Sequence, residues 1–171
     1  MSFKPDLGRL GLTELSEDMM NLFKRRIMDI AAITGKKVKV KFNGDIVPVK
    51  QFSQYIDLYI GAKDSCERHY EEANERWTYA ACMSPTDEFT AVSFVNGIYT
   101  SKGGKHVEYI TNQITKKLIT YIEKKKKITV HANAIKEQLM LFVRCDIENP
   151  AFDSQTKDYM NTPMAKFGSS C

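Results

Sequence analysis

The sequence has none of the long apolar runs, leader segments or clustered cysteines that mark several large classes of protein. No run approaches the roughly 18 apolar residues of a membrane-spanning helix, and the first six residues lack the apolar core of a signal peptide. The four cysteines lie far apart, without a C-x-x-C pair or a histidine at metal spacing, at Cys66, Cys82, Cys145 and Cys171. We therefore expect the reduced thiols of an intracellular protein, with neither a zinc site nor a disulfide framework.

Catalytic groupings are missing as well. The chain has no Ser–His–Asp order with flanking glycines, no pair of carboxylates on one face and no cluster of metal ligands. Arg68-His69-Tyr70 lies in an acidic stretch, which does not favour a nucleophilic tyrosine. These absences indicate a chain that assists chemistry carried out elsewhere.

Lysine is concentrated in one part of the sequence. The whole chain has 25 Lys and Arg against 21 Asp and Glu, a net charge of +4. Between Ser101 and Lys136, nine lysines stand against two glutamates, so this segment carries +7 and the remainder −3. Such a distribution predicts a polyanion that is contacted at one place. A solvated surface run is the alternative, because lysines at a helix C-terminus are favourable in any case.

The 171 residues, of which 43% are hydrophobic, suffice for one packed domain, or one domain and a small part of another. Apolar periodicity predicts a helix capped by Ser16 that ends near Gly35, and further helices over 52–60 and 107–122. Alternating residues on both sides of Asn43-Gly44 predict a β-hairpin.

The remaining elements predicted are strands. Aromatic and β-branched residues predict two long paired strands over 76–83 and 89–98, and a buried strand over 139–147. The acidic stretch 64–75 indicates a loop or an exposed edge strand. The expected fold is α+β, with a mostly antiparallel sheet and helices on one face.

Three segments could contact a ligand. Lys124, Lys125, Lys126 and Lys127 follow the long helix and could bind nucleic-acid phosphates without sequence choice. The polar loop 147–157 contains a lysine and a nearby glutamine, which could hold a terminal phosphate or belong to an ordinary loop. The segment 100–106 lacks the spacing of either phosphate-binding glycine motif, so we interpret it as a turn, with His106 as a capping or packing residue.

Several motifs occur together in an order that resembles one known family. They are the segments 3–7, 42–44, 48–50, 55–59 and 75–77, then Ser93-Phe94-Val95-Asn96-Gly97-Ile98, Thr100-Ser101-Lys102-Gly103-Gly104-Lys105-His106 and 147–157, and finally Phe167-Gly168-Ser169-Ser170-Cys171. In this order they resemble the ATPase-linked transducer domain of type IIA DNA topoisomerases, in particular the branch of eukaryotes and large DNA viruses. The resemblance covers essentially the whole chain.

This resemblance implies a fold like domain 2 of ribosomal protein S5, with a four-stranded, mainly antiparallel sheet. It implies that residues 1–15 are the end of a GHKL ATPase domain or a linker, and that residues 16–171 are the transducer domain. The rest of the GHKL domain would precede this chain, and the TOPRIM region and cleavage core would follow it. The parent enzyme would be a homodimer acting on duplex DNA, in the nucleus or, if viral, at a cytoplasmic replication site, without a membrane partner.

The resemblance also assigns roles to residues. Gln155, Thr156 and Lys157 match a loop that binds the γ-phosphate of ATP, with Lys157 as sensor and catalytic residue. ATP would be held mainly by the upstream domain, Mg²⁺ would belong to the parent enzyme, and this fragment would bind no metal. Lys124 to Lys127 match the loop that touches duplex DNA. The expected function is to couple ATP hydrolysis to gate movement during duplex passage, although the fragment alone would not be active.

Two alternatives stay open. One is a stand-alone, non-enzymatic nucleic-acid-binding module with a basic tip, which a GHKL motif in the upstream reading frame would exclude. The other is a relative of the mismatch-repair ATPases, which share the fold but do not account for the motifs 100–106 and 153–157 together.

Overall fold

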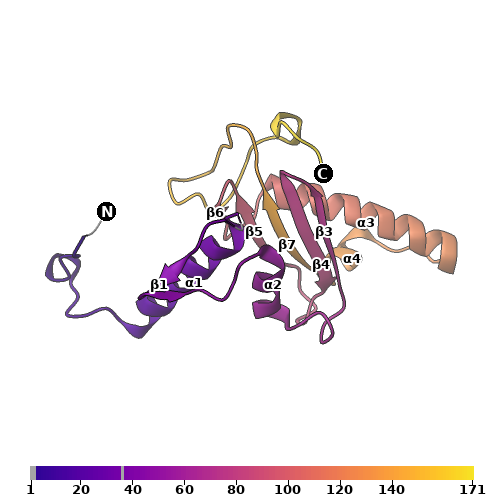
Figure 1. The fold of residues 1–171 in the computed structure, drawn as a ribbon. Helices are drawn as coiled ribbons and strands as arrows, with labels where there is room; N and C mark the ends of the chain where they lie inside the picture. The colour runs from indigo at the N-terminus through magenta and orange to yellow at the C-terminus, as the bar shows by residue number, and fades with distance from the viewer. Residues whose placement is uncertain (1–2, 36) are drawn as a thin grey trace. The chain divides into compact units, whose positions relative to one another are not determined.

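The structure is a computed structural model that describes residues 3–35 and 37–171, in two compact units, Met1–Tyr55 and Ile56–Cys171. Figure 1 labels most of the elements along the chain. The first unit contains η1 (Gly8–Leu10), α1 (Glu17–Ile33), β1 (Lys41–Phe42) and β2 (Asp45–Ile46), and α2 (Phe52–Ile60) leads into the second. The second contains β3 (Arg68–Asn74), β4 (Trp77–Met83), β5 (Thr90–Val95), β6 (Ile98–Tyr99), α3 (Lys105–Lys126), α4 (Ala132–Glu137), β7 (Leu139–Cys145) and η2 (Met164–Lys166).

The first unit contains the helix and the hairpin that the sequence predicts. The hydroxyl of Ser16 accepts a hydrogen bond from the backbone N–H of Met19 at 3.3 Å, which caps α1. Asn43 and Gly44 have φ angles of 51° and 96°, the left-handed pair that a two-residue hairpin turn requires. The prediction of both elements is confirmed, although β1 and β2 are two residues each.

The second unit is built on one mixed sheet. Its strand order is β3-β4-β7-β5-β6, and every pair is antiparallel except β5 with β7, which are parallel. The α+β class is confirmed, but the expected four strands are five. The reason is the turn at Asn96-Gly97, where φ angles of 49° and 79° end β5 and fold the chain back into β6.

The predicted pairing of segments 76–83 and 89–98 is wrong, because β7 lies between β4 and β5. The central position of β7 agrees with its apolar sequence, LMLFVRC. Of its seven residues, only Arg144 is not buried. A strand that is apolar on both faces is stable only with neighbours on both sides and cover above and below. The acidic segment forms the exposed edge strand β3, one of the two forms expected for it.

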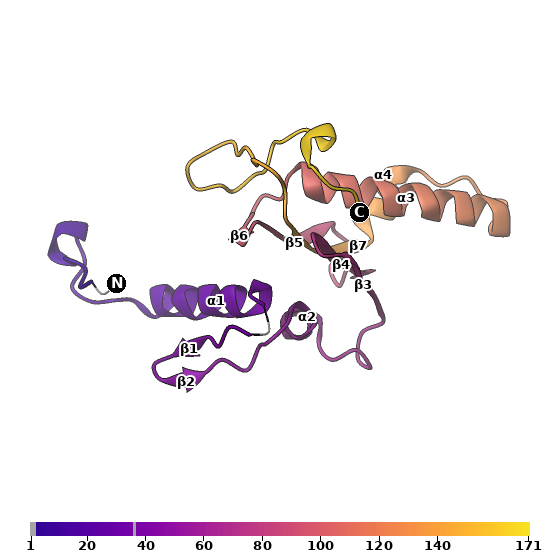
Figure 2. The same ribbon diagram turned by 45° about the horizontal axis from the view of Figure 1, so that its top comes forward.

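The helices do not all cover one face of the sheet. Leu141 and Val143 of β7 pack with Ile110 of α3, and Figure 2 shows α3 and α4 along the same side. Phe142 points to the opposite face, because successive strand residues alternate, and its ring meets Tyr59 of α2 with the centroids 5.6 Å apart. The expectation of helices on a single face is therefore wrong.

The long helix α3 has two different halves. All of its buried residues lie between His106 and Thr115, where the helix covers the sheet. Beyond Thr115 no residue of the helix is buried, and Leu118 and Tyr121 are exposed. In both views the C-terminal half runs on past the sheet (Figures 1 and 2). The last three turns of the helix therefore lie beyond the sheet, where Ile119 and Ile122 are only half buried.

Candidate functional site

Gln155, Thr156 and Lys157 lie in the loop that follows β7, between Ser154 and Asp158. The backbone N–H of Lys157 donates to the carbonyl of Ser154 at 3.1 Å, which closes a tight turn. Lys157 itself has a φ of 60°, in the left-handed region that few residues other than glycine adopt. The turn therefore holds Lys157 in one unusual backbone conformation.

The three side chains of this turn differ in their availability. The hydroxyl of Thr156 is already engaged, because it donates to Asp158 at 2.9 Å and lies 2.9 Å from the hydroxyl of Ser154. Within residues 3–35 and 37–171, neither the ammonium group of Lys157 nor the amide of Gln155 has a hydrogen-bond partner. The Lys157 Nζ lies 5.7 Å from the centroid of the Phe152 ring. One cation and one amide are thus free to bind an anion.

The loop is joined to the glycine turn that precedes α3. The Asp158 carboxylate accepts a hydrogen bond from the Ser101 hydroxyl at 3.1 Å and pairs with the Lys102 ammonium at 3.6 Å. The backbone N–H of Lys102 donates to the carbonyl of Asp158 at 2.9 Å. The hydrogen bond from Thr156 is the main cause that holds the pKa of the Asp158 carboxyl below its ordinary value. Asp158 therefore stays ionised and links the two segments at neutral pH.

The backbone makes a second connection. The N–H of Met160 donates to the carbonyl of Gly103 at 3.1 Å, and the N–H of Lys105 donates to the carbonyl of Met160 at 2.8 Å. A Cβ atom on Gly104, whose φ is 144°, would lie 2.3 Å from the carbonyl oxygen of Met160. Only glycine fits there, so the turn expected at 100–106 is confirmed and is also the surface on which the loop rests.

His106 is a packing residue, one of the two roles that the sequence allows. Its side chain is completely buried, and the Nε2 atom lies 3.3 Å from the hydroxyl of Thr100. The Thr100 hydroxyl lies in turn 2.6 Å from that of Ser93. Burial lowers the pKa of His106 to about 3, so the ring is neutral.

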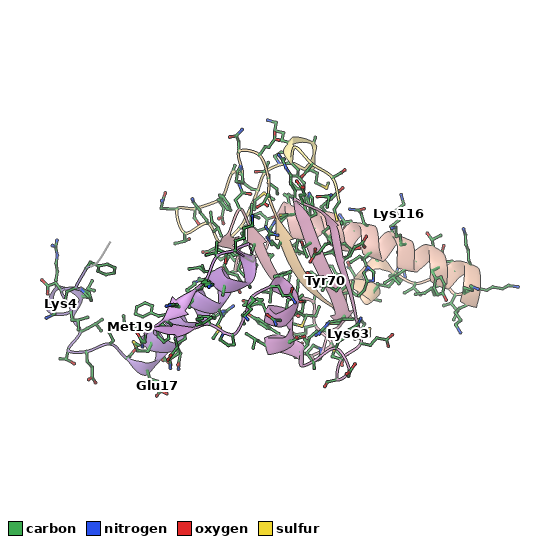
Figure 3. All side chains as sticks on the ribbon, in the orientation of Figure 1. Lys4, Glu17, Met19, Lys63, Tyr70 and Lys116 are labelled. Atoms are coloured by element: carbon green, nitrogen blue, oxygen red, sulfur yellow. The ribbon has the colours of Figure 1, made fainter. Side chains whose placement is uncertain are left out.

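The lysine run forms the end of α3 rather than a separate loop. Lys124, Lys125 and Lys126 make its last turn, and Lys127 caps it with a φ of 55°. All four are exposed, and within the described ranges none of them forms an ion pair. Lys116, labelled in Figure 3, extends outward from the same exposed half of the helix. We call Lys124 to Lys127 the lysine tip.

The structure therefore does not bring the two predicted sites together. The loop with Lys157 rests on the first turn of α3, and the lysine tip is its last turn. A helix of 22 residues is about 33 Å long, at 1.5 Å a residue. Contacts at the two ends would be separate in space but joined by one rigid element.

Other kinds of site are absent from the described part of the chain. In residues 3–35 and 37–171, no three His, Cys, Asp or Glu side chains gather in a group that could hold a metal ion. No helix in these ranges has the length and apolar character needed to cross a bilayer.

Comparison with known proteins decides the family. The sequence profile described as DNA gyrase B matches residues 49–170, which is more than two thirds of the chain. The chain belongs to the DNA gyrase B and DNA topoisomerase 2 family. The resemblance to type IIA topoisomerases that the motifs carry is thereby confirmed.

Relatives and solved structures agree with this assignment. DNA topoisomerase 2 of Arabidopsis thaliana is 44% identical over 178 residues, which cover 100% of this chain and 12% of the plant protein. The ATPase region of Saccharomyces cerevisiae topoisomerase II superposes with a TM-score of 0.87 at 40% identity, over 99% of this chain and 43% of that one. The ATPase and transducer domains of the Balamuthia mandrillaris enzyme give 0.89 at 37% identity, over 98% and 42%. The chain thus spans about an eighth of the length of the curated relative.

Sequence reasoning missed Asp158 and its contacts with Ser101 and Lys102. Asp158 directly follows the predicted site, but its carboxylate meets Ser101, 57 positions earlier in the chain. Tyr159 likewise meets Glu108, 51 positions earlier. No local pattern encodes contacts at that separation. The only available signal was that two polar motifs of the same family, 100–106 and 153–157, accompany each other.

Proposed function

We propose that this chain is the transducer part of an ATP-dependent type II DNA topoisomerase. Residues 16–171 form the transducer domain in this proposal, and residues 1–15 are the end of a GHKL domain or a linker. The family membership supports it, as does the superposition on a structure described as the ATPase and transducer domains of a topoisomerase II. The parent enzyme would be a homodimer that uses ATP and Mg²⁺ to pass one DNA duplex through another.

The observation that carries the nucleotide-sensing role is that the ammonium group of Lys157 and the amide of Gln155, two residues apart in one turn, have no hydrogen-bond partner among the described residues. An ATP γ-phosphate would supply a compact group of anionic oxygens at this loop. Lys157 can neutralise such a group, and Gln155 can donate an amide N–H to it. Lys157 thereby also opposes the charge that builds up when a phosphoryl group is transferred, which is why we assign it a catalytic role.

Thr156 acts differently from its neighbours in this proposal. Its hydroxyl is bonded to Asp158 and Ser154, so it contributes to nucleotide binding by shaping the turn. The donor set Gln155 and Lys157 contains no carboxylate, so it suits the phosphate and not the metal ion. Mg²⁺ therefore belongs to other parts of the parent enzyme.

The lysine tip is proposed to contact the phosphates of duplex DNA. Its four cations are exposed and unpaired among the described residues, so no ion pair has to break when DNA binds. Such contacts give affinity without sequence choice. Movement of the domain when the γ-phosphate is lost would couple hydrolysis to the DNA gate.

The test is Lys157→Ala in the full-length protein that carries this chain. We expect ATP hydrolysis to fall by about 100-fold, since loss of one charge-stabilising donor commonly costs this much. DNA cleavage should be unchanged. Lys166→Ala makes the same chemical change at an exposed lysine of the same unit and is the matched control. Normal ATP turnover in Lys157→Ala would overturn the sensing role.

A stand-alone nucleic-acid-binding module is the second candidate, and the unpaired lysine tip favours it. It predicts that the 171 residues bind duplex DNA strongly by themselves and need no ATPase partner. A GHKL motif upstream in the reading frame decides against it.

A further inference from the structure

The loop that carries Lys157 is fixed to α3 on two sides. On one side, the hydroxyl of Tyr159 donates to Glu108 of α3 at 2.9 Å. Glu108 also accepts a hydrogen bond from the ammonium group of Lys105 at 2.8 Å. The same α3 turn therefore holds both a cation and the tyrosine of the loop.

On the other side, Asp158 makes three side-chain contacts. They are with Thr156 within the turn at 2.9 Å, with Ser101 at 3.1 Å and with Lys102 at 3.6 Å. Thr156 and Asp158 are the two residues that flank Lys157. The Asp158 carboxylate therefore fixes the turn internally and also fixes it to the segment before α3.

The backbone of Lys157 needs such support. A residue other than glycine in the left-handed region is strained, and it persists only where its surroundings determine the conformation. The backbone N–H of Lys157 donates to the Ser154 carbonyl at 3.1 Å, a bond within the turn itself. The side-chain contacts of Asp158 add support on both sides of Lys157, beside the backbone bonds that join residues 153 and 159 and residues 102 and 158.

We propose that Asp158 is a positioning residue for Lys157, which holds the loop against the glycine turn before α3 so that the Lys157 ammonium meets the terminal phosphate of the nucleotide. This inference rests on the proposed role of Lys157. It adds that the loop and the glycine turn form one body: loss of the Asp158 carboxylate would loosen the turn around Lys157, although the backbone bonds to the glycine turn remain, and would leave Lys157 chemically intact.

The first test is Asp158→Asn in the full-length protein. The substitution keeps the size of the side chain and removes the charge that binds Lys102. We expect kcat for ATP hydrolysis to fall between about 10- and 100-fold, as for a reacting group that is displaced by about 1 Å, with KM changed less than about twofold. Asp158→Glu restores the carboxylate and should recover most of the loss.

The matched control is Asp64→Asn, the same chemical change at an exposed carboxylate of the same unit. It should leave kcat unchanged. A change in KM alone for Asp158→Asn, or a loss equal to that of the control, would overturn the positioning role. Thermal unfolding of both variants separates a loss of folded protein from a loss of activity per folded molecule.

A double substitution identifies the route of the effect. If Asp158 acts through Lys157, Asp158→Asn should cause no further loss of kcat when Lys157 is already alanine. If the fold-losses of kcat in the two single variants multiply in the double variant, Asp158 acts independently of Lys157, which would contradict the inference.

These results also separate the inference from the function on which it rests. If Lys157→Ala hydrolyses ATP at the normal rate, both the proposed sensing role and the inference are wrong. If Lys157→Ala loses ATP hydrolysis while Asp158→Asn keeps it, only the inference is wrong. In hydrogen exchange, Asp158→Asn should speed exchange in residues 101–106 and 154–160 together, and exchange confined to 154–160 would refute the single body.

Discussion

Gly104→Ala tests whether the loop and the glycine turn depend on their close backbone approach. Gly104 has φ 144° and ψ −167°, a region that is essentially reserved for glycine and costs other residues about 1–3 kcal/mol. The added Cβ would lie 2.3 Å from the Met160 carbonyl oxygen and 2.6 Å from its nitrogen, so the two segments must separate.

Separation removes the two backbone hydrogen bonds that join them, Met160 to Gly103 and Lys105 to Met160. Each is worth about 0.5–1.5 kcal/mol net. The total loss is therefore on the order of 2–6 kcal/mol, a large part of the roughly 5–15 kcal/mol that stabilises an ordinary domain.

The assay is urea unfolding of the 171-residue chain, with Gly103→Ala as the control. Gly103 has a φ of 71°, but its added Cβ would meet the Val107 side chain at ordinary distances of 3.5 and 3.8 Å. The control therefore measures the cost of a left-handed alanine without a steric clash. Its free energy of unfolding should fall by about 1 kcal/mol. If the free energy of unfolding falls by the same amount in Gly104→Ala and Gly103→Ala, within about 0.5 kcal/mol, the close backbone approach contributes nothing to stability.

Two further predictions concern titration and salt. Because burial lowers the pKa of His106 to about 3, from about 6.5 when unfolded, the unfolded chain binds a proton first and stability falls as pH drops below 6.5. Unfolding at pH 5 should show a loss of about 2 kcal/mol relative to pH 8, and His106→Gln should abolish this contribution; a pH dependence identical to that of the unmodified chain would contradict it. Replacing Lys124 to Lys127 with glutamine should weaken DNA-stimulated ATP hydrolysis and reduce the salt slope of DNA binding by about 0.9 for each phosphate that is no longer neutralised, whereas an unchanged slope would exclude the lysine tip as the DNA-binding surface.

Local patterns predicted the local parts of the fold. The Ser16 cap and the turn at Asn43-Gly44 are encoded within four residues, and both occur. Asn96-Gly97 is the same hairpin signal, but it lies inside the apolar run 89–98, whose composition is typical of one long strand. At this position the turn dipeptide outweighs the continuous apolar pattern.

The sheet topology depends on a distant segment. Strand β7 begins at Leu139 and is inserted between β4 and β5, with a parallel partner on one side. Periodicity does not encode which strands meet, so the sequence favours pairing two strands that are adjacent in the chain. The sequence did contain one signal for a central position. Residues 139–143 of β7 are all apolar, as in a strand that is buried on both faces.

For the candidate site too, the sequence predicted the local features but not the contacts between distant segments. The motif identified Gln155 and Lys157, and the structure leaves both side chains without a hydrogen-bond or ion-pair partner within the described residues. The motif could not show that the Thr156 hydroxyl is hydrogen-bonded to Asp158. Nor could it show that Asp158 links the turn to Ser101 and Lys102. Those contacts are made across the fold and follow from packing, not from sequence spacing.

A structure of the longer protein with a bound ATP analogue is the direct test of whether Lys157 binds the terminal phosphate. We expect the Lys157 Nζ within about 2.7–3.0 Å of a γ-phosphate oxygen, with Gln155 donating to the same group. The Asp158 contacts to Ser101 and Lys102 should still be present. A γ-phosphate bound entirely by other residues, with Lys157 directed into solvent, would contradict it.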